Sequence, residues 1–212
     1  MCIRDRYRPA ALYSFSPSSG PISGDTLIRV GGNHSIAIDH GCDVRCKFAR
    51  AAEQRGSRSI IVQGTLVATE TGVVHCTSPA GVGSGPLEIS LNGQQYTDSA
   101  VRLDTYSTPS LVEVSPPLGP SSGNTSLRLT VTNLSDVGSD VRCRFSSATS
   151  SGDPDDVLAV IDPREPSSIL TCTTPPHRPI GVDELRITLN GQQFSDPLSY
   201  FVLAPPMIST IY

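Results

Sequence analysis

The chain has 212 residues and a net charge of -4, and 17% of its residues are charged. It lacks the basic surplus that phosphate neutralisation requires, so a nucleic-acid partner is not expected. No apolar run approaches the roughly 18 residues that span a bilayer, so no direct membrane insertion of this segment is expected. A content of 18 Gly and 18 Pro, with no Trp, favours a turn-rich β protein over a helical or disordered one.

The first eight residues, MCIRDRYR, are charged and lack the apolar stretch of a signal peptide. We interpret residues 1–8 as a leader that lies outside the fold and is either truncated or artefactual. Secretion therefore has to be inferred from other features of the chain.

Short segments rich in β-favouring residues follow, separated by Gly and Pro. They include residues 27–30, 87–91, 127–131 and 185–189. The pairs Asn92-Gly93 and Asn190-Gly191 come directly after two such segments. Because a type I′ turn needs positive φ at both central positions, which Asn-Gly adopts readily, the sequence predicts a hairpin with a two-residue turn near the end of each half.

Four sequence blocks recur in the same order with a period of about 97 residues. The paired blocks are 16–26 with 115–125, 43–48 with 140–145, 75–79 with 171–175, and 91–96 with 189–194. Copies of this length with strands and turns at this spacing suit a sandwich of some seven strands. The fold class is therefore predicted to be all-β, with two tandem immunoglobulin-like β-sandwiches.

The repeat also predicts the domain boundaries. Residues 9–107 form repeat 1 and residues 108–204 form repeat 2, joined near Thr108 and Pro109. Pro109 fixes its own φ and biases the preceding residue towards extended geometry, so the join is expected to be short and restricted. Residues 205–212 match the opening of repeat 2 and are interpreted as the first strand of a third repeat.

Four of the six cysteines obey the repeat, which gives each copy its own pair. These cysteines are Cys46 and Cys76 in the first copy, and Cys143 and Cys172 in the second. A bridge across about thirty residues would stabilise a small sandwich by roughly 3 to 4 kcal/mol, and such bridges persist in oxidising compartments. Buried free thiols remain the alternative at this point.

Three Asn-x-Ser/Thr sequons agree with an extracellular location, at Asn33, Asn124 and Asn133. Asn33 and Asn133 fall just after the second strand of each copy, where a loop could carry a glycan. Chance occurrence in a Ser/Thr-rich chain is the alternative. N-linked glycans are therefore expected on this segment, with the occupancy of each sequon left open.

Cys42 has no counterpart in the second copy, where Ser139 takes its place, and it is predicted to be the unpaired cysteine. It could pair with Cys2, bridge to another chain or stay a free thiol. A zinc site with the nearby histidines is rejected, because the spacing is not that of paired zinc ligands and the second copy lacks the extra residues. No cofactor or metal is predicted.

The acidic residues near position 155 and the aromatic residues do not indicate a binding site. Asp153, Asp155 and Asp156 lack a recognised calcium-loop spacing and are interpreted as a solvated charged turn. The aromatic residues are expected largely in strands, and examples are Phe48, Phe145, Tyr96 and Phe194. With aromatic residues at only 5%, stacking on sugars is poorly provided for.

The chain resembles the IPT/TIG family of immunoglobulin-like domains over about nine tenths of its length. The resemblance is carried by the opening Ser-Pro-x-x-Gly-Pro-x-Ser-Gly-(Asp/Asn)-Thr, by Val-Arg-Cys-x-Phe and by Cys-Thr-x-Pro in both copies. It implies one disulfide within each domain, Cys46 with Cys76 and Cys143 with Cys172. The family's usual Gly-x-x-Phe is replaced by Gly32-Asn-His-Ser in the first copy and by Thr132-Asn-Leu-Ser in the second.

Members of this family occur in plexin-like receptors, in large surface proteins, beside secreted enzymes and in some transcription factors, so the resemblance does not fix a function. Paired cysteines, sequons and the acidic balance disfavour the nuclear members. No motif of a catalytic site is present, and no enzyme is expected. The sequence favours a structural or adhesive spacer of a cell-surface or secreted glycoprotein, whose partners are its own repeats and other extracellular proteins. A ligand-recognition module, either receptor segment or carbohydrate-binding accessory, is the alternative.

Overall fold

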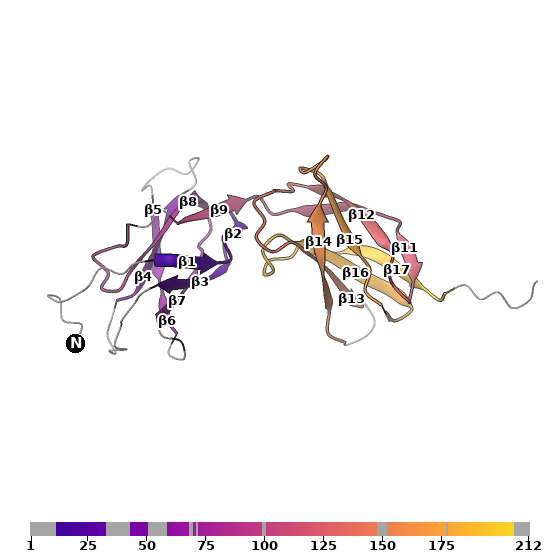
Figure 1. Ribbon diagram of the computed structural model, residues 1–212, viewed down its shortest axis with the longest axis horizontal. Helices are drawn as coiled ribbons and strands as arrows, with labels where there is room; N and C mark the ends of the chain where they lie inside the picture. The colour runs from indigo at the N-terminus through magenta and orange to yellow at the C-terminus, as the bar shows by residue number, and fades with distance from the viewer. Residues whose placement is uncertain are drawn as a thin grey trace, which may run out of the picture. The chain divides into compact units, whose positions relative to one another are not determined.

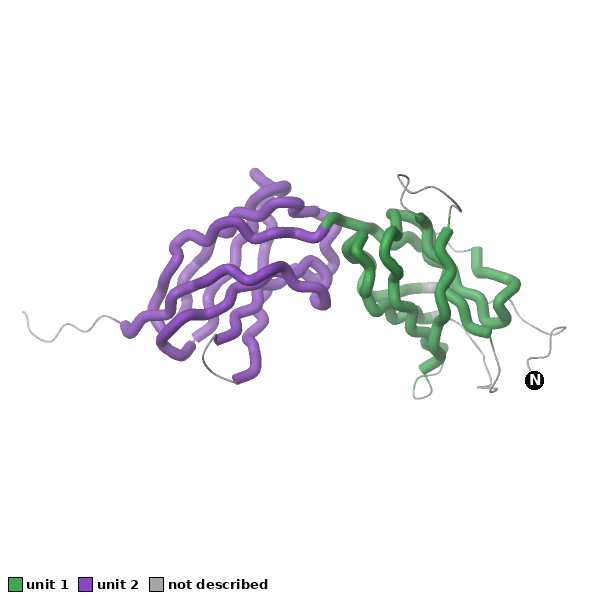
Figure 2. Tube along the Cα trace, turned by 180° about the vertical axis from the view of Figure 1, so that it is seen from behind, with its two compact units in different colours: residues 1–107 green, residues 108–212 purple. Residues whose placement is uncertain are grey.

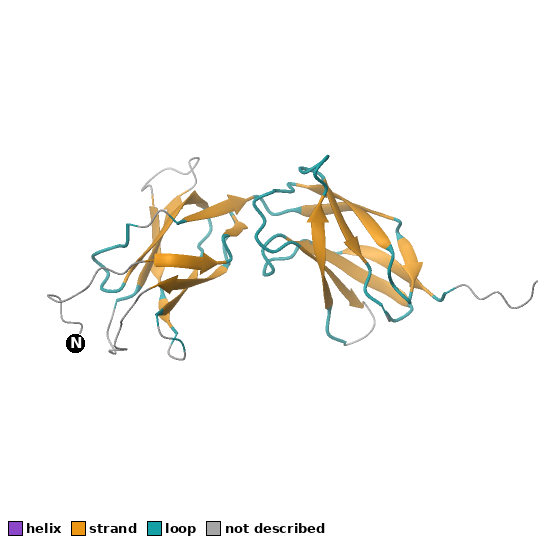
Figure 3. Cartoon of the chain, viewed as in Figure 1, coloured by secondary structure: helices purple, strands orange, loops and turns teal. Residues whose placement is uncertain are grey.

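The structure is a computed structural model that describes residues 12–32, 43–50, 59–67, 70, 72–98, 101–147, 152–176 and 178–205. The chain divides into two compact units, Met1–Ser107 and Thr108–Tyr212, coloured separately in Figure 2. The described residues form strands and loops (Figure 3). Among them there is no helix long and apolar enough to cross a membrane. The prediction of an all-β, immunoglobulin-like fold is confirmed.

The first unit contains two sheets. One sheet has the strand order β1 (Leu12–Ser16), β3 (Leu27–Gly32), β7 (Val73–Thr77) and β6 (Thr65–Leu66). The other has the order β2 (Ser19–Pro21), β9 (Arg102–Tyr106), β8 (Val82–Ser90), β4 (Arg45–Arg50) and β5 (Ser59–Gln63).

The second unit repeats this arrangement. Its strands follow the order β10 (Ser110–Ser115), β12 (Ser126–Thr132), β15 (Ile169–Thr173), β14 (Asp155–Ile161), β13 (Arg142–Ser147), β16 (Gly181–Thr188), β17 (Leu198–Leu203) and β11 (Leu118–Pro120). The strands from β10 to β14 correspond to the first sheet of the first unit, and those from β14 to β11 correspond to the second sheet. A register shift interrupts the first strand of each unit at the equivalent place, between Leu12 and Ser14 and between Leu111 and Glu113.

Strand β14 belongs to both sheets of the second unit. Residues 155–158 pair with β13, and residues 159–161 pair with β15 (Figure 1). In the first unit the same path is broken into β5 and β6 at Gly64, whose amide donates to Val44 O at 2.9 Å. Ala159 is the equivalent residue, because its amide donates to Val141 O at 3.0 Å. We call β14, and β5 with β6, the switch strand of each unit.

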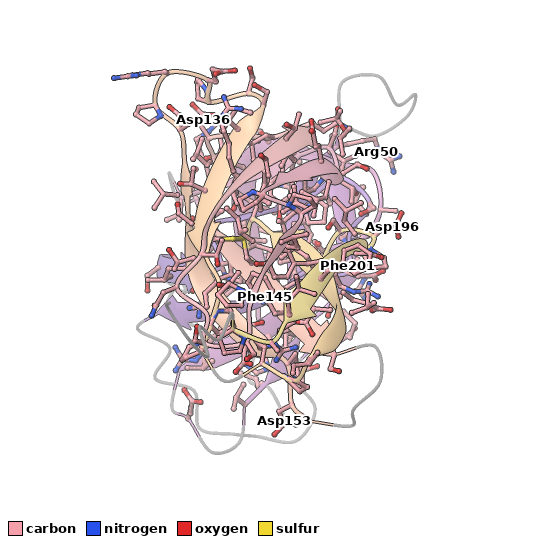
Figure 4. The ribbon with its side chains drawn as sticks, turned by 90° about the vertical axis from the view of Figure 1, so that its right-hand side faces the viewer. Arg50, Asp136, Phe145, Asp153, Asp196 and Phe201 are labelled. Atoms are coloured by element: carbon pink, nitrogen blue, oxygen red, sulfur yellow. A yellow bond between two sulfur atoms is a disulfide. The ribbon has the colours of Figure 1, made fainter. Side chains whose placement is uncertain are left out.

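Each core is built from side chains that point inward between the two sheets of its unit. The strand pattern alternates, as in β12, where the residues at 127, 129 and 131 are buried and those at 126, 128 and 132 are exposed. Such alternation is what a half-buried strand requires. Phe48 and Phe145 occupy equivalent places with exposed fractions of 1% and 0%, and Phe145 is seen inside the second unit in Figure 4.

The Asn-Gly pairs do not form the predicted two-residue type I′ turns. Gly93 and Gly191 have φ of 71° and 74°, but neither Asn92 nor Asn190 has positive φ. Strands β8 and β9 do form an antiparallel pair, as do β16 and β17, so a hairpin closes each unit with a longer loop. The Asn side chain changes the turn, because its Oδ1 atom accepts the amides of the second and third residues that follow.

Gly64 provides a test of how the switch strand packs. A Cβ atom at this position would lie 2.8 Å from the Cys46 Sγ atom and 2.9 Å from the Val44 Cγ1 atom. Because Cys46 is held in a disulfide, we expect Gly64→Ala to destabilise the first unit by about 1 to 3 kcal/mol through overpacking. Native-state hydrogen exchange of the β3 and β7 amides measures this loss, with the second unit's β12 and β15 amides as the control. Unchanged exchange in β3 and β7 would contradict it.

Candidate interaction surfaces

The structure joins Cys46 to Cys76 and Cys143 to Cys172, with Cα atoms 6.0 and 6.6 Å apart. Each bond links the two sheets of its unit, from β4 to β7 and from β13 to β15. The bond in the second unit lies beside the switch strand, because Cys143 is in register with Val157 and Cys172 with Ala159. All four sulfur-bearing residues are nearly inaccessible, with exposed fractions of 0 to 5%.

Two of the three sequons lie in the described residues. Asn124 and Asn133 are both exposed and adopt positive φ, 59° and 56°. Asn124 precedes β12, and Asn133 follows it, so they lie at opposite ends of the same strand. The Asn133 Nδ2 atom donates to Thr108 O at 3.3 Å. The remaining sequence-predicted residues, Asn33, Cys42 and Cys2, lie outside the described residues.

The repeated blocks meet in pairs. At the end of the second unit where β12 begins, the amide of Asn124 donates to Thr174 O at 3.0 Å, and the amide of Thr125 donates to the Thr174 hydroxyl at 3.0 Å. The first unit repeats both bonds, from Asp25 to Ser78 O at 2.8 Å and from Thr26 to the Ser78 hydroxyl at 3.1 Å. The (Asp/Asn)-Thr block and the Cys-Thr-x-Pro block therefore recur because they fasten one turn to another.

The other two blocks meet at the opposite end of the second unit. Asp140 forms a bridge with Asn190, and its Oδ1 atom accepts from the Arg142 Nε atom at 2.8 Å. The Asn190 Oδ1 atom accepts from the amides of Gln192 and Gln193 at 3.1 and 3.2 Å. In the first unit, Asp43, Arg45, Asn92 and the glutamines after it make the equivalent bonds. This polar network fixes a loop that would otherwise need positive φ at both turn residues.

Among the described residues, the second unit has a buried ion pair that the first unit lacks. The Arg178 guanidinium donates to both carboxylate oxygens of Asp183 at 2.8 Å, and donates to Asp155 at 2.6 Å. The exposed fractions of the Arg178 and Asp183 side chains are 7% and 1%, whereas that of Asp155 is 49%. The bonds to Asp183 and then to Asp155 raise the pKa of Arg178, against the effect of burial. Gly85 and Ala49 pack against each other at the place in the first unit that Asp183 takes here.

The acidic segment is the solvated turn that the sequence predicted only at Asp153, which lies in an exposed loop. Asp155 and Asp156 begin β14, and each faces an arginine rather than water alone. Arg144 binds Asp156 through two nitrogen atoms at 2.6 and 2.7 Å, and this bond lowers the pKa of Asp156. Cross-strand pairing explains the contact, because Arg144 and Asp156 are in register. Among the described residues, no cluster of three or more potential ligands could hold a metal ion.

The aromatic residues were placed correctly only in part. Phe48 and Phe145 are in strands, but Tyr96 and Phe194 lie in the loops after β8 and β16. The Lys47 ammonium lies 5.2 Å from the centre of the Tyr96 ring, and the Arg144 guanidinium lies 3.8 Å from the centre of the Phe194 ring. Both rings are thus stacked against cations of their own unit, on the outer face of the sheet.

Two apolar surfaces of the second unit are open to solvent. The first, which we call the apolar strip, runs along β11 and β17, where Leu118, Phe201 and Leu203 are 47%, 47% and 46% exposed. Phe201 is labelled in Figure 4. Leu118 is in register with Phe201, so their side chains lie on one face. In the first unit the register pair is Ser19 with Asp104, and Ser19 is buried there.

The second surface is a shallow groove of about 380 Å³ over the switch strand and β15, which we call the β14–β15 groove. Leu158 and Val160 project from β14 with 72% and 63% of their surface exposed. The groove is lined by these two residues and by Ser126, Val157, Thr171, Cys172, Thr173, Thr174, Pro175 and Pro176. Hydroxyl groups and apolar side chains thus share its walls.

Comparison with known proteins agrees with this geometry. The IPT/TIG domain family matches residues 109–202. Plexin-2 of Caenorhabditis elegans and Plexin-2 of Caenorhabditis briggsae are 32% and 31% identical over 210 residues, which is 96% of this chain and 10% of each relative. The chain therefore spans a tenth of the length of these curated relatives. The solved extracellular region of plexin A4 superposes with a TM-score of 0.51 at 16% identity, covering 87% of this chain and 15% of that one.

These findings identify an extracellular segment with an immunoglobulin-like fold, whose residues 109–202 match the IPT/TIG domain. The chain contains an IPT/TIG domain and is homologous to plexins. The two disulfides indicate an oxidising compartment, and together with the plexin homology they place the segment outside the cell or at its surface.

The Arg178 pair gives a test with a built-in control. Arg178→Ala leaves the Asp183 carboxylate buried without its guanidinium, so we expect a loss of about 3 to 5 kcal/mol of unfolding free energy in the second unit. Asp155→Ala removes the half-exposed partner of the same arginine and should cost no more than about 1 kcal/mol. Urea denaturation compares the two variants. Similar losses for both would contradict the view that burial decides the difference.

Asp156 predicts a pH dependence. A carboxyl group whose pKa is lowered on folding stabilises the folded state above its ordinary pKa, and that contribution disappears as the pH falls through the lowered value. We expect Asp156→Asn to reduce stability at pH 7 by at most about 1 kcal/mol, because the pair is partly exposed to water and salt. The difference from wild type should shrink below about pH 4. A difference that stays constant down to acid denaturation would rule out this charge contribution.

Proposed function

We propose that this chain is a non-catalytic segment of a receptor ectodomain, in which two disulfide-bonded sandwiches act as a structural spacer and contribute protein contacts. The observation that carries the proposal is the homology to Plexin-2, which extends over 96% of the chain and therefore over both units. Repeat 1 at 9–107, repeat 2 at 108–204 and the start of a third repeat at 205–212 are the domain divisions that we propose within that ectodomain.

Several structural features support a spacer. Each unit has its own buried core and its own disulfide between the sheets, so each unit is held together by its own interactions. The linker residue Thr108 is held by Asn133, which limits the freedom of the chain where it enters β10. The two networks of repeated blocks fix turns at both ends of the second unit. A spacer needs such fixed ends more than it needs a pocket.

The alternative, a ligand-recognition module, is favoured by one specific observation. The apolar strip of Leu118, Phe201 and Leu203 is exposed, whereas the residues equivalent to Leu118 and Leu203 in the first unit, Ser19 and Tyr106, are buried. Apolar residues gathered on a surface without a need for them in the core are typical of protein contacts. A carbohydrate-binding role has less support, because Tyr96 and Phe194 are covered by Lys47 and Arg144 on one ring face.

A replacement experiment in the full-length protein separates the two roles. The segment is exchanged for two unrelated rigid immunoglobulin-like domains with the same end-to-end length, and signalling by the cell-surface receptor is measured. A spacer predicts that signalling survives the exchange and is lost when the segment is deleted. Loss after the exchange as well would contradict the spacer.

A point variant provides the matched test of recognition. Phe201→Ser, placed on the exposed strip, should leave folding and signalling unchanged if the segment is a spacer, since Phe201 is half-exposed and outside the core. Phe145→Ser, in the core, serves as the unfolding control. Loss of signalling in a folded, surface-expressed Phe201→Ser receptor would instead assign the strip to a ligand.

A further inference from the structure

The β14–β15 groove exposes more apolar surface than the fold explains. Leu158 and Val160 follow each other on the outer face of the switch strand, with 72% and 63% of their surface accessible. Val160 is in register with Thr171, and the groove continues along β15 to Thr174, Pro175 and Pro176. Neighbouring exposed side chains of this kind on an extracellular module are typical of a surface that another group covers.

The sequon at Asn124 borders one end of this groove. The amide of Asn124 donates to Thr174 O at 3.0 Å, and Thr174 is a groove residue. Ser126, the third residue of the sequon, lines the groove itself. Asn124 is exposed, so its side chain is accessible for modification. A group attached there begins beside the groove rather than at a distance from it.

The two units differ in both features together. By the β-sheet registers, Gln63 and Thr65 of the first unit take the places of Leu158 and Val160. The first unit also has Asp25 in place of Asn124, because both donate to the equivalent carbonyl group at the turn. At these two positions the unit that carries the Asn124 sequon has apolar side chains, and the other unit has polar ones. Elsewhere the first unit exposes apolar side chains too, because Leu27 replaces Ser126 and Ile61 of its switch strand is 47% exposed.

We propose that an N-linked glycan on Asn124 lies along the β14–β15 groove and covers Leu158 and Val160. The chemistry of the sugar suits the lining, because each pyranose has apolar C–H faces and a rim of hydroxyl groups, and the groove offers Leu, Val and Pro side chains beside Ser and Thr hydroxyls. No aromatic residue is needed for such a contact when the sugar is tethered, since attachment raises its effective concentration.

The modification itself requires a glycosyl donor of the secretory pathway, a lipid-diphosphate-linked oligosaccharide. The Asn124 Nδ2 atom forms a bond to C1 of the first N-acetylglucosamine and loses one proton. The bond from that carbon to the diphosphate oxygen breaks, and the lipid diphosphate leaves with the electron pair. An extracellular segment passes through the compartment that supplies this donor.

The first test establishes contact. The chain is secreted from cells with methyl-labelled Leu and Val, and glycan occupancy is read by mass spectrometry of the peptide that contains Asn124. We expect occupancy there, and nuclear Overhauser effects between the sugar protons and the methyl groups of Leu158 and Val160. An unoccupied Asn124, or an occupied one whose sugar shows no such effects, would overturn the proposal.

The second test is a cycle of variants with a dye that binds exposed apolar surface, 1-anilinonaphthalene-8-sulfonate. Removal of the glycan by Asn124→Gln should raise the bound-dye fluorescence at least about twofold. In the Leu158→Gln/Val160→Thr background, which copies the first unit, the same removal should have no effect. An equal rise in both backgrounds would overturn the proposal.

Three controls keep the result specific. Ser126→Thr keeps the sequon and should behave as wild type, whereas Ser126→Ala removes it and should behave as Asn124→Gln. Asn133→Gln, at the far end of β12, should leave the dye fluorescence unchanged. Enzymatic trimming of the wild-type glycan repeats the test without any substitution. Dimerisation of the fully glycosylated chain that Leu158→Gln/Val160→Thr abolishes would assign the groove to a second copy and overturn the proposal.

Discussion

The disulfide that joins the two sheets of each unit is the interaction on which the rest of the structure depends. The side chains packed between the sheets and the switch strand also join them, but the disulfide is the one side-chain bond that is covalent. Cys143 and Cys172 cross next to β14, the strand that leaves one sheet for the other. In the first unit a Cβ atom at Gly64 would lie 2.8 Å from the Cys46 Sγ atom, whereas the second unit has Ala159 at the equivalent position. In each unit the crossing bond lies beside the switch strand, with the groove of the second unit on that strand's outer face.

The two units share the same hydrogen bonds at their turns and differ in the side chains on their surfaces. The turns at both ends are fixed by hydrogen bonds between repeated blocks, which is why those blocks recur while the intervening loops do not. The second unit adds the buried pair of Arg178 and Asp183, the exposed strip on β11 and β17, and the apolar switch strand. When the turns and the core are fixed in this way, the surface residues of one unit can differ from those of the other while the core stays the same. Among the described residues, these features distinguish the surface of the second unit from that of the first.

The sequence predicts the architecture because repetition and β patterning are both visible in one dimension. It also pairs the four cysteines as the structure does, through the family resemblance and the repeat. It misses features that depend on register. The pairing of Asp156 with Arg144 joins strands that the sequence does not show as neighbours, and the roles of Arg178 and Asp183 depend on burial. The Asn-Gly turns are misjudged because the Asn190 side chain accepts backbone amides and replaces the expected turn geometry. Leu158 and Val160 are hidden in a segment whose alternation is obscured by inward-facing apolar residues.

The most direct test of the central claim removes one crossing bond and observes both units. In the Cys143→Ala/Cys172→Ala variant, the bridge over a separation of 29 residues is lost. We expect the β12 and β15 amides to lose about 3 to 4 kcal/mol of protection against hydrogen exchange, while the β3 and β7 amides of the first unit keep theirs. The matched Cys46→Ala/Cys76→Ala variant should show the reverse. Equal loss in both units, or no loss in the unit whose bond was removed, would contradict the account of two autonomous sandwiches, each fastened by its own disulfide.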